Sequence, residues 1–197
     1  MRKVSVKKIA VINKCEAVDV SFVPPLVRRR LSPIQKVYFA LANLAEEEAA
    51  SSVVFASSDG EVSLTRRLQE EFELDGAVSP HKFSASVYNA APGLWSVFTK
   101  NNAKYTAVVA RDDSIEVGLL EALTSEFPSL LVYAEEDEGG YGVSVYFSSR
   151  EGVEIKYSFD ASIDAAPISF HAFVDFLEGR INVLQGRYMR FEHSIKG

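Results

Sequence analysis

The residues best suited to chemistry lie in a short polar turn, Arg111-Asp112-Asp113-Ser114. The segment before it, 105–110, has the apolar character of a strand, and segment 115–125 after it has the pattern of a helix. Many α/β enzymes hold a nucleophile on such a strand-turn-helix, because the turn lifts one side chain out of the sheet and the helix N-terminus stabilises negative charge. Where a cysteine or serine nucleophile would be expected, this turn offers an arginine and two acids. The scaffold of a nucleophile site is therefore present without its nucleophile.

Three interpretations of this turn are open. In the first, Ser114 or an aspartate caps the following helix, where acids in the first turn contribute about 0.3–1 kcal/mol. In the second, Asp112 is an acid catalyst. In the third, the turn has lost its nucleophile and holds an ion pair between Arg111 and an acid. Removing the nucleophile from a triad-type enzyme lowers its rate on the order of 10⁶-fold, so the third interpretation predicts a chain that is inactive by itself.

Two other hydroxyl groups, those of Ser57 and Ser58, precede the turn residues Asp59-Gly60. The three histidines, at positions 81, 171 and 193, stand in no recognisable frame with either serine. Turn formation is therefore the preferred role for both serines.

The elements that must position these residues alternate between strand and helix. Ser32-Pro33 predicts a capped helix start, and Glu138-Gly139-Gly140-Tyr141 predicts a hairpin turn. The order is βαβαβαββ, which favours a mainly parallel sheet with an antiparallel edge. The expected strands are 4–12, 52–56, 105–110, 130–134 and 143–147, and the expected helices are 33–48, 64–72, 83–98 and 115–125. After Arg150 we expect a strand at 153–160, a helix at 170–178 and a strand at 187–193.

Several motifs resemble, in their order and spacing, the N-terminal half of a β-ketoacyl synthase. Ser79-Pro80 and Asn89-Ala90-Ala91-Pro92-Gly93 precede the strand and turn, and Gly118-Leu119-Leu120-Glu121-Ala122 follows them. In that family a similar helix precedes the elbow with the active-site cysteine, whose slot falls here at Asp112, give or take one residue. The chain is more closely similar to short ketosynthase-like chain length factors of aryl polyene and related type II polyketide pathways. The resemblance covers roughly residues 26–136. Two further runs support it, which are Arg28-Arg29-Arg30-Leu31-Ser32-Pro33 and Val53-Val54-Phe55-Ala56-Ser57-Ser58-Asp59-Gly60-Glu61.

The resemblance implies a thiolase-like α/β half fold over residues 1–149. It would consist of a mixed, mainly parallel five-stranded sheet flanked by helices, and residues 150–197 would form a small α+β extension on the same domain. A full ketosynthase duplicates this unit, and its activating histidines lie in the half that this chain lacks. Half of a duplicated fold exposes apolar surface unless a partner or a remodelled C-terminal segment covers it.

The resemblance also implies that the chain is not an enzyme by itself. It would be a non-catalytic chain length factor that pairs with a full-length β-ketoacyl-acyl carrier protein synthase. In that role it would limit the length of a polyene or polyketide acyl chain by closing the substrate tunnel of its partner. Two alternatives are a small thioester-directed acyltransferase or hydrolase, and a scaffold subunit that only stabilises the synthase.

Three groups of residues would serve a chain length factor. The helix at 83–98 would close the tunnel at the dimer interface, with core packing as the alternative for each of its bulky residues, which are Phe83, Val87, Tyr88, Leu94 and Trp95. A strand would pair across the dimer axis through Tyr105, Ala107, Val108 and Val109. Arg28-Arg29-Arg30 would dock the acidic carrier protein or its phosphopantetheine phosphate, or would form a solvated run beside a helix.

Composition narrows the possible partners. The net charge is −6, with +7 over residues 1–36 and −13 over the rest, and an acidic chain is a poor candidate for nucleic-acid binding.

Cys15 is the single cysteine, so neither a disulfide framework nor a zinc pattern is present, and no cofactor or metal site is indicated. We find no signal peptide and no run near the ~20 apolar residues of a membrane span. We therefore expect a cytoplasmic protein without a membrane span.

Overall fold

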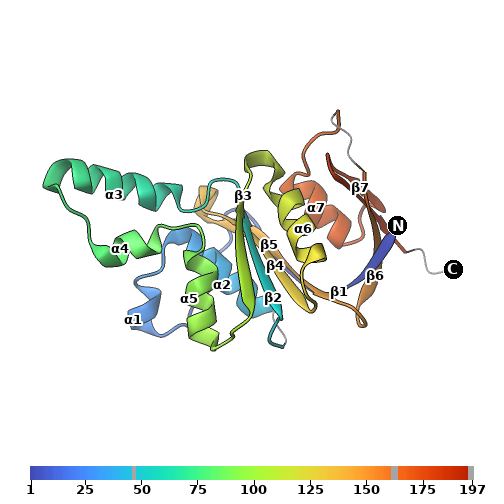
Figure 1. Cartoon of the computed structure of the whole chain (residues 1–197), viewed down its shortest axis with the longest axis horizontal. Coiled ribbons are helices and arrows are strands. Elements are labelled where there is room, and N and C mark those ends of the chain that lie inside the picture. The colour runs from blue at the N-terminus through green and yellow to red at the C-terminus, as the bar shows by residue number, and fades with distance from the viewer. Residues whose placement is uncertain (46–47, 161–163, 195–197) are drawn as a thin grey trace.

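A computed structural model describes residues 1–45, 48–160 and 164–194. The predicted order βαβαβαββ is confirmed, with additional short helices between the strands (Figure 1). This part consists of β1 (Arg2–Ile12), α1 (Pro25–Arg28), α2 (Pro33–Ala45), β2 (Ser52–Ser57), α3 (Val62–Asp75), α4 (Pro80–Ala85), α5 (Ala90–Thr99), β3 (Lys104–Val109), the 3₁₀ turn η1 (Arg111–Asp113), α6 (Ser114–Thr124), β4 (Ser129–Glu135), the 3₁₀ turn η2 (Asp137–Gly139) and β5 (Tyr141–Ser148). The C-terminal part adds β6 (Val153–Phe159), α7 (Phe170–Leu177), β7 (Val183–Gln185) and β8 (Met189–His193).

The described strands form one sheet in the order β3-β2-β4-β5-β1-β6-β8-β7. β2 pairs in parallel with β3 and β4. β5 is antiparallel to both β4 and β1, so β1, β2, β3 and β4 all run in the same direction. The mixed, mainly parallel character expected of the first five strands is therefore confirmed. The antiparallel strand lies inside the sheet and not at its edge, and the hairpin predicted between β4 and β5 is present.

The five strands expected of residues 1–149 are present, and the C-terminal extension adds β6, β8 and β7 to the same sheet of described residues. β6 pairs antiparallel with β1, β8 with β6, and β7 with β8. β1 has 11 residues, and without β6 its outer edge would leave a row of backbone N–H and C=O groups unpaired. The extension therefore continues the sheet at the edge that the first five strands leave open.

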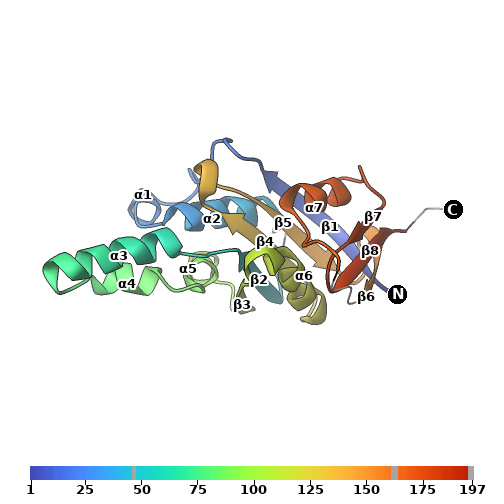
Figure 2. The same cartoon turned by 90° about the horizontal axis from the view of Figure 1, so that it is seen from above.

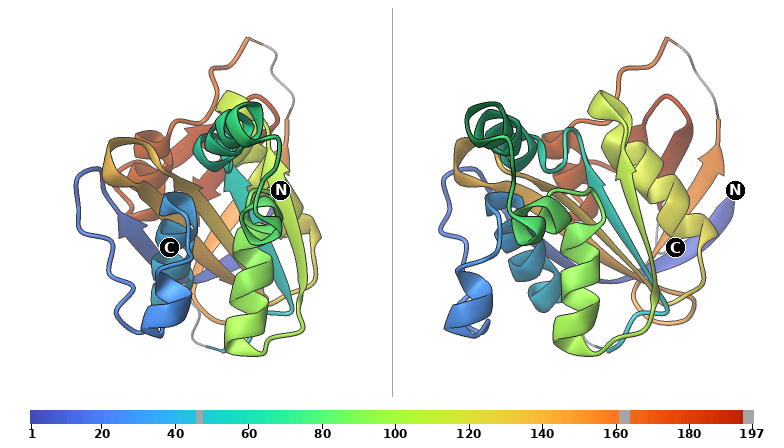
Figure 3. Two further views of the ribbon diagram at one scale, coloured as in Figure 1. Left: turned by 90° about the vertical axis from the view of Figure 1, so that its left-hand side faces the viewer. Right: turned by 60° about the vertical axis from the view of Figure 1, so that its left-hand side comes forward.

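Helices cover both faces of the sheet, as Figure 3 shows. On one face α2 and α5 pack on an aromatic-rich cluster, in which the rings of Phe39 and Trp95 lie 5.1 Å apart. On the other face α6 and α7 pack on a second cluster, which contains Phe173 and Phe176 of α7. The remodelled C-terminal segment thus covers the apolar face that half of a duplicated fold would expose.

The start of α2 follows the sequence signal at Ser32-Pro33. The backbone N–H of Gln35 donates to Ser32 Oγ at 3.2 Å, and the N–H of Ser32 donates to Gln35 Oε1 at 3.1 Å. This reciprocal pair is a capping box, which satisfies two N–H groups that the helix cannot bond internally. The predicted helix start is therefore confirmed.

The single helix expected at 83–98 is wrong, because the structure has two helices, α4 and α5, separated by residues 86–89. The reason is Pro92, which lacks an N–H and is tolerated only in the first turn of a helix. A helix through Pro92 must therefore begin just before it, and α5 begins at Ala90. The side chains before and after the break do not share one helical phase.

α3 and α4 extend away from the body of the molecule, as Figure 2 shows. We call these two helices, residues 62–85, the arm. Of the 14 residues of α3 only Leu68 is buried, and of the six residues of α4 only Ala85 is buried. The two helices contact each other, and α4 contacts α5. The arm is thus attached to the body mainly at its root.

Candidate functional site

An open groove of about 570 Å³ lies beside α1, α4 and α5 and has a mainly apolar lining. It brings together members of all three predicted groups: Arg30 of the arginine run, Val87 and Leu94 of the tunnel-closing group, and Tyr105 of the interface strand. Val97, which is 77% exposed, lines the groove as well. The sequence analysis missed Val97, although its spacing of three residues from Leu94 places both on one face of α5.

The other three residues of the tunnel-closing group lie outside the groove lining. Trp95 is 3% exposed and packs against the rings of Phe39 and Phe98, so core packing is its role in this chain. Phe83 and Tyr88 are 61% and 53% exposed. The Tyr88 ring lies close over the turn after β2, because a Cβ added at Gly60 would stand 2.5 Å from its Cδ1 atom.

The strand β3 lies at the edge of the sheet, and its partner there is β2. Alternate residues of a strand face opposite sides. Tyr105, 42% exposed, faces the groove, whereas Val108 packs on the cluster beneath α6. A sheet edge with apolar side chains presents N–H and C=O groups to which another chain can pair. The described geometry therefore suits the expected interface strand.

The turn between β3 and α6 has the strained backbone of a nucleophile elbow. Arg111 has a φ of 52°, in the left-handed region that a residue with a side chain rarely adopts. Arg111 Nη1 pairs with Asp59 Oδ1 at 3.0 Å, but the arginine side chain is 83% exposed. An ion pair this exposed contributes about 0–1 kcal/mol. The pair between Arg111 and an acid therefore exists, but it does not fill a buried pocket of this chain.

The interpretation of this turn as a side-chain cap of α6 is wrong, because the expected capping hydrogen bond is not made. Asp113 is the N-cap residue and makes no side-chain cap hydrogen bond. The buried hydroxyl of Ser114 accepts from the N–H of Ala110 at 2.9 Å and donates to the carbonyl of Ser57 at 2.8 Å. Ser114 therefore ties the elbow to the end of β2.

The C-terminal extension is anchored on a buried acid that the sequence analysis did not single out, Glu116. Its carboxylate accepts hydrogen bonds from the three consecutive N–H groups of residues 187–189, at 2.6–2.9 Å. Arg187 also pairs with both carboxylate oxygens of Asp113, at 3.1 and 3.2 Å. A Cβ at Gly186 would stand 2.4 Å from Glu116. The only sequence signal was an acid in the first turn of a helix, which surface electrostatics explains equally well.

A second buried acid, Glu61, lies at the root of the arm. Its Oε1 accepts from Ser32 Oγ at 3.0 Å and from Gln35 Nε2 at 2.7 Å, and Gln35 Nε2 also donates to the carbonyl of Ala85. Among the described atoms, Oε2 of Glu61 has no hydrogen-bond partner. Burial raises the pKa of Glu61 to about 7, although the hydrogen bonds from Ser32 and Gln35 act in the opposite direction. This network joins α2, the turn after β2, and the end of α4.

A second cleft, of about 360 Å³, adjoins the elbow and is lined by Ser58, Asp112 and Tyr133 among others. Ser58 Oγ lies 3.4 Å from Tyr133 Oη, and Ser57 Oγ donates to Glu135 Oε2 at 3.1 Å. Burial raises the pKa of both Tyr133 and Glu135. The two serines thus hold the turn after β2 against the end of β4, which is the turn role that we expected of them.

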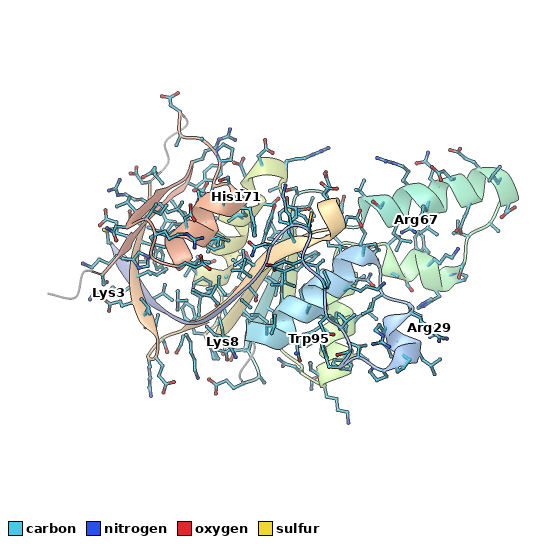
Figure 4. The ribbon with its side chains drawn as sticks, turned by 180° about the vertical axis from the view of Figure 1, so that it is seen from behind. Lys3, Lys8, Arg29, Arg67, Trp95 and His171 are labelled. Carbon is cyan, nitrogen blue, oxygen red and sulfur yellow. The ribbon has the colours of Figure 1, made fainter. Side chains whose placement is uncertain are left out.

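The arginine run spans the end of α1 and the segment after it. Arg28 is half-buried, and Arg29 and Arg30 are exposed. Figure 4 shows Arg29, the residue after α1, at the same end of the molecule as the arm, which carries Arg67. Because Arg30 also lines the groove, the run places positive charge at the rim of that groove.

Two findings concern the part of the chain that the structure describes. No group of three or more His, Cys, Asp or Glu side chains there could hold a metal ion. None of the helices in those residues has the length and apolar character that a membrane crossing requires.

Comparison with known proteins connects this geometry to one family. Residues 4–138 match the family model described as "Beta-ketoacyl synthase, N-terminal domain". One similar solved structure is "Ketosynthase (ApeO) in Complex with its Chain Length Factor (ApeC) from Xenorhabdus doucetiae", with a TM-score of 0.77 and 18% sequence identity. The similarity covers 98% of this chain and 100% of that chain, and at this identity it shows a shared fold. Curated proteins give no match.

Proposed function

This chain belongs to the β-ketoacyl synthase family, through the N-terminal domain of that family, and on this basis we propose that it is a non-catalytic chain length factor. It pairs with a full-length β-ketoacyl-acyl carrier protein synthase and limits the length of the polyene or polyketide acyl chain. It does so by closing the far end of the substrate tunnel of its partner.

The observation that carries the proposal is the elbow after β3. Its backbone has the strained strand-turn-helix geometry that presents a nucleophile in other α/β enzymes, and its strained residue is Arg111. An arginine side chain remains protonated in proteins and is not a nucleophile. The next residues are two aspartates and Ser114, whose hydroxyl is buried and bonded on both sides. The turn retains the shape of a condensing site but offers neither the thiol of a cysteine nor a free hydroxyl group as its nucleophile.

The proposed partner surface is the edge strand β3 together with the groove beside it. Tyr105 is the residue of β3 that reaches the groove, so pairing at this edge would also cover the groove. The Xenorhabdus doucetiae structure combines a ketosynthase with its chain length factor, and the alignment covers the full length of the matched chain. This supports a pair of the same kind here. A stable pair of this type is expected to bury more than about 2,000 Å².

The proposed length limit is steric. Val87 and Leu94 line the groove, and Phe83 and Tyr88 are exposed outside its lining. Each condensation extends the acyl chain by two carbons, and forcing extra methylenes into a filled apolar space costs roughly 1–3 kcal/mol. That range corresponds to a preference of about five- to 160-fold against the next extension.

The acyl chain arrives on a carrier protein, whose acidic surface and phosphopantetheine phosphate suit arginine side chains. We assign this docking to Arg28, Arg29 and Arg30. The exposure of Arg29 and the position of Arg30 at the rim of the groove support the assignment.

The test compares three samples in a carbon dioxide release assay with malonyl-carrier protein: the chain alone, the synthase alone, and the co-expressed pair. We expect background release from the chain alone. We also expect Val87→Ala in the pair to shift the carrier-bound products, measured by mass spectrometry, toward longer chains. Val183→Ala is the matched control, because Val183 is 42% exposed on β7 and Val87 is 43% exposed. Turnover by the chain alone would contradict the proposal.

The same assay addresses the alternative of a small thioester hydrolase or acyltransferase. The feature that favours it is the contact between Ser58 and Tyr133 in the cleft beside the elbow. Burial raises the pKa of Tyr133, which keeps the phenol protonated and leaves no phenolate to act as a base for a serine. Hydrolysis of acyl-carrier protein by the chain alone, lost in Ser58→Ala, would favour this alternative over the chain length factor.

A further inference from the structure

The cleft beside the elbow, with its volume of about 360 Å³, is lined by three aromatic side chains, those of Tyr133, Tyr141 and Phe170. The centroid of the Phe170 ring lies 6.4 Å from that of Tyr133 and 5.0 Å from that of Tyr141. The rings come from β4, β5 and α7, so the C-terminal extension supplies the third ring. Aromatic rings attract a cation to their faces, more strongly where water is excluded. This lining therefore favours a cation over an anion.

The charged side chain in the lining is an acid, Asp112. Within the described residues its exposed carboxylate forms neither a hydrogen bond nor an ion pair. Arg111, its neighbour in the sequence, pairs instead with Asp59. Arg187 pairs with Asp113. Because no lysine, arginine or histidine stands among the described residues that line the cleft, the negative charge of Asp112 has no counter-ion there.

The remaining polar groups of the lining are neutral hydroxyls. Burial raises the pKa of Tyr133 and of Tyr141, so both phenols keep their protons at neutral pH. Ser58 Oγ lies 3.4 Å from Tyr133 Oη, and Ser169 Oγ accepts from the N–H of Ala172 at 3.2 Å. Such oxygen atoms can accept a hydrogen bond from an N–H group of a ligand, but they add no positive charge to the cleft.

One ammonium group of the chain itself is already held by a ring of this set. Nζ of Lys14 lies 4.9 Å from the centroid of the Tyr141 ring, within the ~6 Å over which a ring attracts a cation. Lys14 follows β1 and stands outside the described lining of the cleft. The volume of the cleft lies near the lower end of the roughly 300–1,000 Å³ that small-molecule sites span. A small cation thus fits both the charge and the size of the cleft.

We propose that this cleft binds a small organic cation, whose ammonium group lies against the rings of Tyr133, Tyr141 and Phe170 and pairs with the carboxylate of Asp112. The site is separate from the groove and from the edge strand β3, so the inference does not depend on the proposed function. It gives a role to the acid at the slot where the resemblance places the cysteine of a condensing enzyme. The acid there is the counter-ion of a bound cation.

The experiment titrates the purified full chain with choline by calorimetry at low ionic strength, where charge interactions are least screened. The matched probe is dimethylbutanol, the neutral analogue of choline in which a carbon atom replaces the nitrogen. We expect saturable binding of choline in the millimolar range, as suits a ligand of so few atoms. The neutral analogue should bind at least about ten-fold more weakly, because it has the shape of choline without its charge. Equal binding of the two probes, or no binding of choline, would refute the proposal.

Two variants test the acid and the rings separately. Asp112→Lys should weaken choline binding about ten-fold, because it replaces an attractive charge by a repulsive one. Its control, Asp160→Lys, makes the same change at another exposed acid and should bind within about two-fold of the wild type. Tyr141→Leu keeps an apolar side chain but removes a ring, and should weaken binding about ten-fold. Tyr188→Leu, at a tyrosine outside the described lining, is the control for the ring.

Amide chemical shifts from nuclear magnetic resonance locate the bound cation. We expect choline to shift the amide signals of Ser58, Asp112 and Ser169, and to leave those of residues 93–97 beside the groove unchanged. Circular dichroism verifies the fold of each variant; if Tyr141→Leu does not fold, Asp112→Lys at its exposed position and the shift map decide. Shifts confined to other parts of the chain, or undiminished choline binding by Asp112→Lys, would overturn the assignment and leave the proposed function standing.

Discussion

Replacing Glu61 by glutamine should remove a pH dependence of stability that the fold creates. Glu61 is 1% exposed and accepts two hydrogen bonds on Oε1, while Oε2 has no partner among the described atoms. Burial is the main cause that raises its pKa from 4.5 to about 7; Glu136 raises the pKa further and Arg67 lowers it. The folded state therefore favours the protonated carboxyl group, which glutamine imitates in shape and in its neutral charge.

The sign and size follow from linkage. Between pH 4.5 and pH 7 the folded state binds more protons at this site than the unfolded state, so the free energy of unfolding falls as the pH rises. For a pKa of about 7 when folded and 4.5 when unfolded, the loss between pH 5 and pH 8 is about 2–3 kcal/mol. Relative to wild type, the unfolding free energy of Glu61→Gln should therefore increase by about 2–3 kcal/mol over this interval.

Urea denaturation at pH 5 and pH 8 measures this difference, with the fluorescence of Trp95 as the signal, since it is the single tryptophan and is buried. Glu70→Gln, at an exposed position of α3, is the matched control and should leave the pH dependence unchanged. The burial of Glu135 also raises its pKa, and for this reason the comparison is between variant and wild type. A difference between the two that stays constant within about 0.5 kcal/mol from pH 5 to pH 8 would refute the reasoning.

Three further changes test the packing, the interface and the anchor of the extension. Trp95→Ala should lower the unfolding free energy by about 3–5 kcal/mol, because it empties a core site, and a loss under about 1 kcal/mol in urea denaturation followed by circular dichroism would contradict this placement. Tyr105→Lys should abolish co-elution with the synthase on size exclusion, whereas Tyr188→Lys, with 43% exposure against 42% for Tyr105, should not; an intact pair with Tyr105→Lys would place the interface elsewhere. Glu116→Ala should lower the unfolding free energy by at least about 3 kcal/mol, because three N–H groups lose a charged acceptor. It should also speed amide exchange at residues 187–189, and unchanged exchange there would argue against the anchor.

Local sequence patterns predicted most of the order of strands and helices. The alternation of strand and helix, the capped helix start at Ser32 and the glycine-rich hairpin turn are each decided by residues close in sequence, and the structure confirms all three. The break between α4 and α5 was also readable, because Pro92 admits a helix only from its first turn. The continuous helix at 83–98 was a misjudgement of that signal.

Long-range contacts decided the rest. The sequence by itself determined the polar turn at residues 111–114, its place after a strand, and the absence of a cysteine in it. Only the tertiary structure decided that Arg111 holds the strained position, and that Glu116 binds a loop more than 70 residues away. The same holds for the groove, where side chains from α1, α4, α5 and β3 meet. Periodicity reports which face of an element is apolar, but not which remote segment covers that face, because the latter depends on how the whole chain packs.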